Sequence, residues 1–427
     1  MTTTLTQNQT QTQTQTAAAA SRQSPAPAPR PHQAADVIRD EAQALKVAQE
    51  FADYIAPGAL QRDRDRILPW EEVERFSQSG LWAMTVPREY GGAGVSTGVL
   101  ARAVSLISAA DGNFGHIPQN HFYSLEVLRV GGTPAQKSFF YQKVLKGERL
   151  GNALAEIGHR DFKRRTQLLR EADGWFVQGQ KFYCTGALYA HWIPTLVTAV
   201  EEGGERLYLV FIPRDAAGVS ITDDWDGFGQ RVTGSGSVQF DRVRVEPEWV
   251  VPFTSSFERP TTIGPFAQII HAALDAGIGH GALQAALPFI AQRARPWIDS
   301  GVERASQDPL LLEHLGNVHV RLRAADALIQ RAALAVDAAQ RQPDEDSVAA
   351  ASIAVAGAKA LSTSASLLAS NKLLELGGTA ATLAAHGLDR FWRNARTHTV
   401  HDPVRWKYHA VGNYVLNGVR PPRHGAI

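Results

Sequence analysis

The densest group of titratable side chains lies in residues 390–412, whose sequence is RFWRNARTHTVHDPVRWKYHAVG. This segment holds five basic residues, three histidines and one aspartate between two apolar helical patterns. Core packing does not require such a density of ionisable groups, and histidine exchanges protons near neutral pH. We therefore expect the segment to face a polar group and to be a candidate for acid–base chemistry.

The local sequence also indicates how these histidines are positioned. Asp402 precedes Pro403, a pair typical of a helix start, and apolar residues then recur at helical spacing as far as Val415. We expect His398, His401 and Asp402 on the lead-in and first turn of this helix. If Asp402 only caps the helix, the histidines are solvated. These three residues could also bind a metal ion, but the sequence has no second group of residues at metal-ligand spacing, so we expect no metal.

Length and composition favour an enzyme that acts on a small molecule. With 427 residues and a formal net charge of +1, the chain can bury a large core and has no excess charge for nucleic acid or an anionic membrane. Cys184 is the only cysteine, which excludes an internal disulfide and fits a reducing compartment. No apolar run of membrane-spanning length and no signal peptide are found, so we expect a cytoplasmic protein.

The composition changes along the chain divide it into a tail and three units. Residues 1–33 are rich in Thr, Gln, Ala and Pro, which predicts a disordered tail. Residues 34–148 show helical periodicity, with Pro69 opening one helix. Residues 149–258 contain short runs rich in Val, Leu and Thr, such as TLVTAV and LYLVFIP, which predict β-strands. Asp173-Gly174 and Glu202-Gly203-Gly204 predict turns between strands.

The last unit, residues 259–427, is helical again. Its apolar patterns predict four long helices, which would form a bundle. They lie at about 264–294, 308–341, 345–375 and 403–416. In the preceding β unit no glycine-rich loop follows a strand and opens a helix, so a Rossmann nucleotide-binding unit is not supported.

Several separated phrases resemble the acyl-CoA dehydrogenase superfamily in the correct order. They are LWAMTVPREYGGAGVS at 81–96, GQKFYCTGA at 179–187 and LGG at 376–378 followed by RFWRNAR. The resemblance covers about residue 36 to the end. It implies an α+β multidomain fold with an N-terminal helical domain, a middle β-barrel or sandwich and a C-terminal four-helix bundle, and a homotetramer.

Within that superfamily the chain most resembles the flavin-dependent monooxygenase branch, which includes dibenzothiophene monooxygenases and SfnB-type sulfur-acquisition oxidoreductases. The phrases KFYCTGALYAHW, DGFGQRVTGSG and RNARTHTVHDPVRWKYHAVGNYVLNG carry this resemblance. It implies that reduced FMN from a separate flavin reductase reacts with oxygen to give a flavin hydroperoxide, which oxygenates a small organosulfur compound. A dry site with a few placed donors would protect this intermediate.

The chain departs from the dehydrogenases at the catalytic base. The dehydrogenase phrase that carries a glutamate base aligns with residues 401–404, where Asp402 is one methylene shorter and adjoins a proline. A second glutamate position of the family aligns near Ile269, with only His271 nearby. Two alternatives stay open: an FAD-dependent acyl-CoA dehydrogenase with Asp402 as base, and a flavin-binding protein without turnover.

The resemblance assigns the catalytic positions. His401 matches the C-terminal active-site histidine of the branch, and Asn152 matches the asparagine near the reactive edge of the flavin. A further histidine is expected in the phrase GHIPQNHF, where the alignment leaves His116 and His121 as alternatives and His116 is favoured. An asparagine at a strand end also serves as an ordinary turn-former.

The resemblance also assigns cofactor contacts. Tyr183 and Thr185 match the aromatic and hydroxyl residues of the flavin-contacting strand, and Trp225 matches a residue that lines the cavity. Cys184, between the first two, is expected to be packed rather than reactive. Arg295 matches an arginine that reaches a flavin phosphate across a subunit interface. The residues that follow, SGVERASQDP, depart from the phrase near the FAD adenylate, which favours FMN over FAD.

Overall fold

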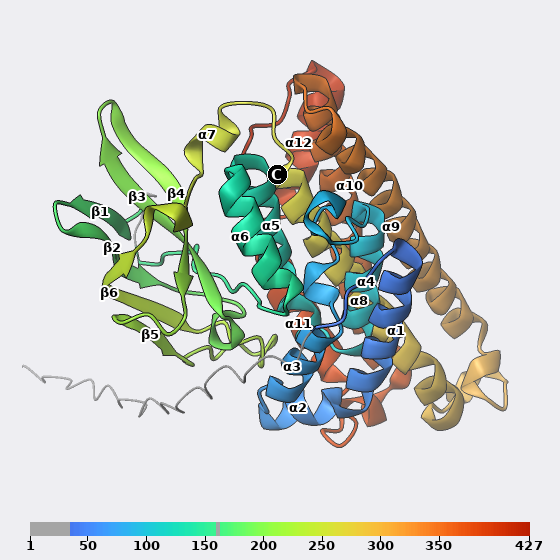
Figure 1. The fold of residues 1–427 in the computed structure, drawn as a ribbon. Helices are drawn as coiled ribbons and strands as arrows, with labels where there is room; N and C mark the ends of the chain where they lie inside the picture. Colours follow the sequence, from blue (N-terminus) through green and yellow to red (C-terminus); the bar gives the residue numbers. More distant parts are fainter. Residues whose placement is uncertain (1–34, 159–162) are drawn as a thin grey trace, which may run out of the picture.

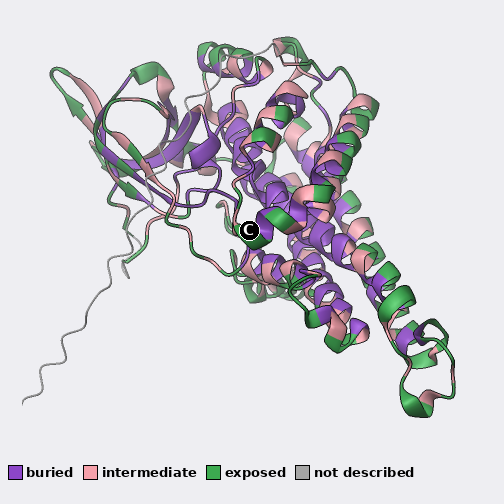
Figure 2. Cartoon of the chain, turned by 90° about the horizontal axis from the view of Figure 1, so that it is seen from below, coloured by how far each residue is buried: buried purple, intermediate pink, exposed green. Residues whose placement is uncertain are grey.

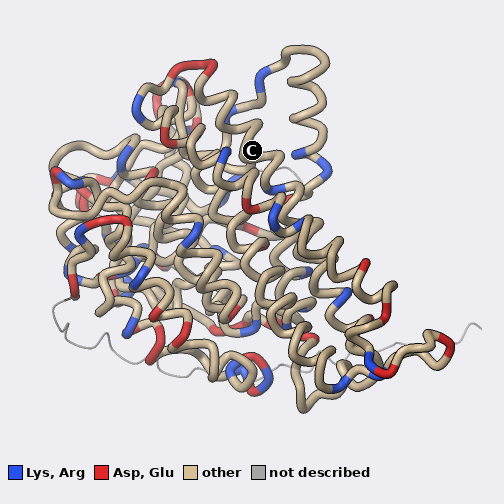
Figure 3. Tube along the Cα trace, turned by 90° about the vertical axis from the view of Figure 1, so that its right-hand side faces the viewer, with Lys and Arg blue, Asp and Glu red and all other residues tan. Residues whose placement is uncertain are grey.

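The computed structural model describes residues 35–158 and 163–427, and the expected tail at 1–33 lies outside the described residues. The chain runs through a helical part, a β-sheet and a second helical part, which confirms the expected α+β class (Figure 1). Figure 1 shows α5 and α6 between the sheet and the long helices. Basic and acidic residues are spread along the trace in Figure 3.

The N-terminal helices follow the expected periodicity. They are α1 (Glu41–Ile55), α2 (Ala59–Asp65), α3 (Trp70–Gln78), α4 (Thr97–Ala110), α5 (Gln119–Gly131) and α6 (Pro134–Leu145). Helix α3 begins directly after Pro69 and has Glu71 and Glu72 in its first turn, where acidic side chains favour the positive end of the helix dipole. A short 3-10 helix, Phe114–His116, precedes α5 and brings a histidine to the interior.

The strands form one seven-stranded sheet of order β5-β6-β2-β1-β3-β4-β7. Its strands are β1 (Gln167–Glu171), β2 (Gly174–Lys181), β3 (Trp192–Glu201), β4 (Gly204–Pro213), β5 (Val219–Thr222), β6 (Ser237–Val245) and β7 (Val250–Pro252). Strands β1 and β3 pair in parallel and the other neighbours pair antiparallel. The expected glycine turns join β1 to β2 and β3 to β4.

The second helical part contains the four expected long patterns and two further helices, α7 and α11. Its helices are α7 (Thr254–Phe257), α8 (Ile263–Arg293), α9 (Pro309–Arg341), α10 (Glu345–Gly377), α11 (Asp389–Thr399) and α12 (Arg405–Asn417). Helix α10 is long and apolar enough to cross a membrane by composition, which the sequence expectation missed. It packs against α8 and α9, and 67% of its apolar window is buried inside the protein, as for a core helix.

Helix α8 is the centre of the molecule. Nearly all of its first half is buried, and its residues share one hydrophobic core with the N-terminal helices (Figure 2). A Cβ at Gly277 would lie 2.5 Å from the carbonyl oxygen of Ser105, and one at Gly281 would lie 2.3 Å from that of Ala109. Glycine at these positions therefore lets α4 approach α8 closely, which places the two helical parts around a common interior.

The expected helix start at Asp402-Pro403 is wrong. Helix α12 begins at Arg405, and its N-cap position is Val404, whose side chain makes no capping hydrogen bond. His398 lies on the last turn of α11, and His401 and Asp402 lie in the connection between the two helices. Asp402 does not cap the helix because its carboxylate is turned toward His401, 3.4 Å away.

Candidate active site

Four histidines from separate parts of the chain meet in the interior. They are His116 before α5, His271 on α8, His398 on α11 and His401 after α11. The His116 and His398 ring centres lie 4.9 Å apart, and His271 lies 5.1 Å from His398 and 4.4 Å from His401. The first three are buried, whereas 47% of the His401 side chain is exposed. We call this group the histidine cluster.

The two histidines of GHIPQNHF have different surroundings in the structure. His116 joins the cluster, with its ring centre 6.5 Å from that of His401. His121 is buried elsewhere: its Nε2 bonds to the Trp82 carbonyl oxygen at 2.8 Å, and its Nδ1 accepts the Leu150 N–H at 3.0 Å. Burial lowers the pKa of His121 to about 3. His121 is therefore a neutral structural residue.

Gln230 orients His116. Its Nε2 donates to the Gly112 carbonyl oxygen at 2.7 Å, which directs Oε1 toward His116 Nδ1, 2.9 Å away. His116 must donate from Nδ1, so its Nε2 carries the lone pair when the ring is neutral. Gln230 has a left-handed φ of 55° and is held by a bond from its N–H to Asn394 Oδ1. Burial and the neighbouring His398 hold the pKa of His116 well below its ordinary value.

A buried ion pair adjoins the cluster. Asp275, on α8, accepts from Lys359 Nζ at 2.6 Å and from Thr363 Oγ1 at 2.8 Å, both on α10. Its other oxygen, Oδ1, lies 2.5 Å from His398 Nδ1. Burial alone would raise the pKa of Asp275, but Lys359 and then His398 hold it well below its usual range. The carboxylate is therefore ionised in the core.

His401 faces Asp402 rather than this ion pair. The Asp402 carboxyl is largely buried, and burial opposes its ionisation, but His401 and then Lys407 hold its pKa well below its usual range. Lys407 is buried as well, and burial lowers its pKa to about 8. Asp402 is thus an ionised partner of His401 at the edge of the cluster.

The expected flavin contacts lie beside the cluster. Strand β2 ends at Lys181, so Tyr183 and Thr185 lie in the turn that follows and not in the strand. Tyr183 has a φ of 55° and is 53% exposed, with its ring edge-on to Trp225 at 6.0 Å. Trp225 Nε1 donates to the carbonyl oxygen of Gln230 at 2.8 Å. The aromatic pair is thereby joined to the residue that orients His116.

Asn152 and Thr185 complete this side of the site. Asn152 is buried, its Nδ2 donates to the Tyr183 carbonyl oxygen at 3.3 Å, and its Oδ1 has no hydrogen-bond partner within the described part of the chain. Thr185 Oγ1 bonds Ser235 Oγ at 2.8 Å, which in turn bonds Thr233 Oγ1 at 2.6 Å. A contact path therefore runs from Asn152 through the aromatic pair to the histidines.

Two expectations concern residues outside this path. Cys184 is fully buried and burial raises the pKa of its thiol, in agreement with a packed residue. Arg295 is exposed just beyond the end of α8. About 22 helical residues, or roughly 33 Å, separate it from His271. The structure does not bring Arg295 to the other candidate residues of the same chain.

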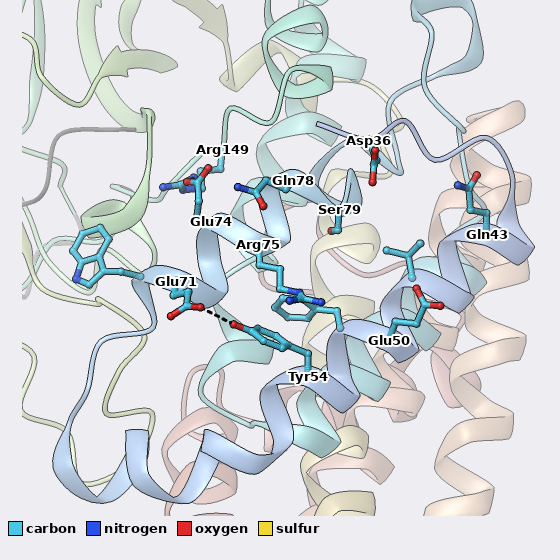
Figure 4. Close-up of a pocket in the computed structure, with 13 residues that line it drawn as sticks. Asp36, Gln43, Glu50, Tyr54, Glu71, Glu74, Arg75, Gln78, Ser79 and Arg149 are labelled. Atoms are coloured by element: carbon cyan, nitrogen blue, oxygen red, sulfur yellow. Dashed lines mark hydrogen bonds and ion pairs between the residues drawn. The ribbon is translucent and has the colours of Figure 1, made fainter. Parts of the chain in front are cut away.

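A separate cavity of about 490 Å³ opens between α1 and α3 (Figure 4). Figure 4 shows Arg75 above the ring of Tyr54, with a distance of 3.9 Å to the ring centre, and Tyr54 bonds Glu71 at 3.2 Å. At the other side of the cavity Arg149 pairs with Glu74 at 3.2 Å. None of the residues that line this cavity belongs to the histidine cluster. We therefore place the candidate active site at the cluster.

Sequence reasoning missed several residues of the site. His271 and Asp275 are four residues apart on the apolar helix α8, and Lys359 and Thr363 are four apart on α10. Polar pairs at this spacing share one helix face, and their place inside apolar patterns was the available signal. Gln230 gave no such signal because it lies in a loop.

The three buried histidines also have the arrangement of a metal-ligand group. Nitrogens of His116, His271 and His398 lie within 4.8 Å of one another, a set that differs from the one considered from the sequence. However, His271 Nδ1 and His398 Nε2 are bonded to each other at 2.9 Å. A metal ion held by all three would have to break that bond, so His271 and His398 form a hydrogen-bonded pair of imidazoles and His116 lies beside them.

Family models match three stretches of the chain. The acyl-CoA dehydrogenase N-terminal domain matches residues 39–148, the middle domain matches 154–243 and the C-terminal domain matches 269–406. These stretches contain the histidine cluster, Asp275, Lys359 and Trp225.

Individual proteins are similar over nearly the whole chain. Dibenzothiophene monooxygenase of Rhodococcus erythropolis is 33% identical over 88% of this chain and 93% of its own length. A probable FMNH2-dependent monooxygenase, SfnC, of Pseudomonas putida is 33% identical over 88% of this chain and 96% of its own length. The crystal structure of FMN-bound TdsC from Paenibacillus sp. A11-2 has a TM-score of 0.86 and 32% identity, covering 90% of this chain and all (100%) of that one.

Proposed function

The chain belongs to the acyl-CoA dehydrogenase family, and from this premise we propose that it is a flavin-dependent monooxygenase that oxygenates a small organosulfur compound. The observation that carries the proposal is the replacement of the dehydrogenase base by histidines. Asp402 is turned to His401 at 3.4 Å, and the other residue near an alternative base position is His271. The similarity to dibenzothiophene monooxygenase supports the substrate class.

The residues around Asn152 fit a flavin. Its buried Oδ1 has no partner among the described residues and would accept from an N–H of the ring. The exposed face of Tyr183 and the indole of Trp225 would contact the flavin ring system, and the Thr185 hydroxyl would bond a polar atom of it. We assign FMN, which is bound in TdsC, as the group. Reduced FMN from a separate reductase would supply oxygen activation through a flavin hydroperoxide.

The chain's own residues would exclude water from the site and would donate and accept protons at defined atoms. His116, His271 and His398 are buried and their pKa values are lowered, so these rings exclude water and offer lone pairs instead of positive charge. His401 is the partly exposed member and lies beside an ionised carboxylate, which suits a group that gains and loses a proton in each turnover. We assign it the acid–base role, with His116 and Asn152 as its partners.

We further propose a cytoplasmic homotetramer. Large apolar side chains are exposed along α9, at Leu310, Val320 and Leu334, and at the end of α12. Burial of such side chains between subunits would be favourable. Arg295 is exposed just beyond the end of α8, where a neighbouring subunit would bring it to the phosphate of another protomer's flavin.

The test is a reconstituted reaction. The purified protein is supplied with FMN, a flavin reductase with its reductant, oxygen and dibenzothiophene, and products are followed by mass spectrometry. An oxygenated sulfur product that requires protein, reduced FMN and oxygen supports the proposal. Formation of an enoyl-CoA from an acyl-CoA with an artificial electron acceptor would replace it with a dehydrogenase that uses Asp402. Bound flavin without any oxygen-dependent product would indicate a protein without turnover.

A further inference from the structure

Four buried side chains, two of which belong to the histidine cluster, form a continuous hydrogen-bonded row. Lys359 Nζ bonds Asp275 Oδ2 at 2.6 Å, Asp275 Oδ1 bonds His398 Nδ1 at 2.5 Å, and His398 Nε2 bonds His271 Nδ1 at 2.9 Å. Each of the four side chains is at least nine-tenths buried. His271 is the end of the row that meets the site, because its ring centre lies 4.4 Å from that of the partly exposed His401.

The ionised carboxylate determines which nitrogens carry protons. Asp275 can only accept, so His398 donates from Nδ1 and has its lone pair on Nε2 when neutral. His271 must then donate from Nδ1, which leaves its own lone pair on Nε2. The ion pair thus fixes, through one intervening ring, the tautomer of a histidine that it does not touch.

The two rings of the row differ in how well they hold a proton. Burial lowers the pKa of His398, but the Asp275 carboxylate opposes the decrease and Lys359 adds to it. Within the described part of the chain His271 has no carboxylate partner, and burial, with His401, His398, Lys359 and His116 around it, holds its pKa well below the ordinary value. A proton that enters the row is therefore more stable on His398 than on His271.

We propose that the Lys359–Asp275 ion pair makes His271 and His398 a proton store for the active site, which rests on the proposed monooxygenase function. A proton from the site binds His271 Nε2, the Nδ1–H bond of His271 breaks, and that proton forms an N–H bond at His398 Nε2. One proton has entered, His398 is an imidazolium beside ionised Asp275, and the reverse shift returns it. No electrons move.

Lys359 and Asp275 are positioning residues in this scheme. The positive charge of Lys359 lets Asp275 stay ionised in the core, and it also weakens the hold of Asp275 on the stored proton. The arrangement follows the logic of a carboxylate that orients a histidine and stabilises its charged form without taking the proton itself.

The first test reads the tautomers in the resting protein. In the Asp275→Asn variant, Lys359 and Thr363 still donate to the side-chain oxygen, so the amide NH2 turns toward His398 Nδ1. His398 and then His271 must carry their protons on Nε2 instead. Nitrogen NMR of selectively 15N-histidine-labelled, flavin-free protein should show Nδ1–H in both rings of the wild type and Nε2–H in both rings of the variant. If the protons stay on Nδ1 in the variant, or if wild-type His271 carries its proton on Nε2, the proposal is overturned.

The control is a second histidine–aspartate pair on the same helix. His280, on α8, bonds Asp326 at 3.0 Å near the surface, and Asp326→Asn should leave the His271 and His398 signals unchanged. His271→Gln, which keeps the ion pair, should lower kcat for sulfur oxygenation about 100-fold or more with little change in KM. A wild-type rate in His271→Gln overturns the proton store. If the wild type oxygenates no sulfur compound, the proposed function fails. The NMR experiment still tests whether the ion pair sets the tautomers of His398 and His271.

Discussion

His271 Nδ1 and His398 Nε2 lie 2.9 Å apart although the two residues are 127 positions apart in the sequence. Helix α8 supplies the first and α11 the second, and both side chains are buried. A hydrogen bond between two imidazoles requires one ring to donate and the other to accept, so this contact sets the tautomers on both sides. This hydrogen bond connects the Lys359–Asp275 ion pair, which bonds His398, with His271, whose ring lies beside that of His401.

His401→Ala should slow sulfur oxygenation about 100-fold, because a positioned acid–base group contributes on that scale. His401 is partly exposed, so its removal should leave the thermal unfolding temperature nearly unchanged. His409→Ala is the matched control, since His409 is an exposed histidine on the neighbouring helix α12. Steady-state rates of the three proteins provide the measurement, and a control loss equal to that of His401→Ala would remove His401 from its assigned role.

Asn152→Ala should weaken FMN binding about fivefold to tenfold, which corresponds to about 1 kcal/mol for a neutral hydrogen bond. The Asn152 Oδ1 atom has no partner among the described residues, so the same change removes only the bond from Nδ2 to the Tyr183 carbonyl oxygen and should cost about 1 kcal/mol of stability. Fluorescence titration with FMN measures the affinity. Asn417→Ala, at the exposed end of α12, should bind FMN as the wild type does. Equal affinities in both variants would mean that Asn152 does not contact the flavin.

Local patterns were sufficient for most of the fold. Pro69 predicted the start of α3, and the glycines after Glu171 and Glu201 predicted two hairpin turns. These features are set within a few residues by φ preferences and capping. The same reasoning failed at Asp402-Pro403, because the carboxylate is turned toward His401 in the folded chain and the helix begins two residues later, at Arg405.

The site itself was only partly predictable. His116 and His121 are five residues apart, and only the tertiary packing, in which the 3-10 turn contacts α4, decides which ring faces His398 and which bonds Trp82. Asp275 escaped notice because its partners come from α10 and α11, and a sequence pattern does not state which helices will touch. The strand that was expected to present Tyr183 ends earlier, because the backbone of Tyr183 has a left-handed conformation that a strand cannot contain.

The free energy of unfolding should fall as the pH falls below about 6.5, well before carboxylates titrate. His121 has its pKa lowered to about 3, and those of His116 and His271 are also lowered. Between the folded and unfolded pKa values the unfolded chain binds more protons, so acid favours unfolding. His121→Phe removes one such group and should reduce the slope between pH 6 and 4 by about 1.4 kcal/mol per pH unit. Urea unfolding across this range measures it, and an unchanged slope would contradict the assignment.

Arg295→Met should weaken FMN binding about tenfold or more, the scale of a hydrogen bond to a charged group. The effect depends on a neighbouring subunit, so it should be present in the assembled protein. Arg293→Met is the control, because this second exposed arginine lies two residues earlier, at the end of α8. Equal affinity for the two variants, measured by FMN titration together with the molar mass in solution, would place the phosphate elsewhere.

The most direct test of the monooxygenase assignment uses isotopically labelled oxygen. The protein is supplied with enzymatically reduced FMN and dibenzothiophene under ¹⁸O₂ in ordinary water, and the sulfur product is weighed by mass spectrometry. We predict that each oxygen atom added to sulfur carries the label, and that His401→Ala forms hydrogen peroxide in place of most of the product. An unlabelled product, or oxidation of FMN to peroxide alone in the wild type, would contradict the account.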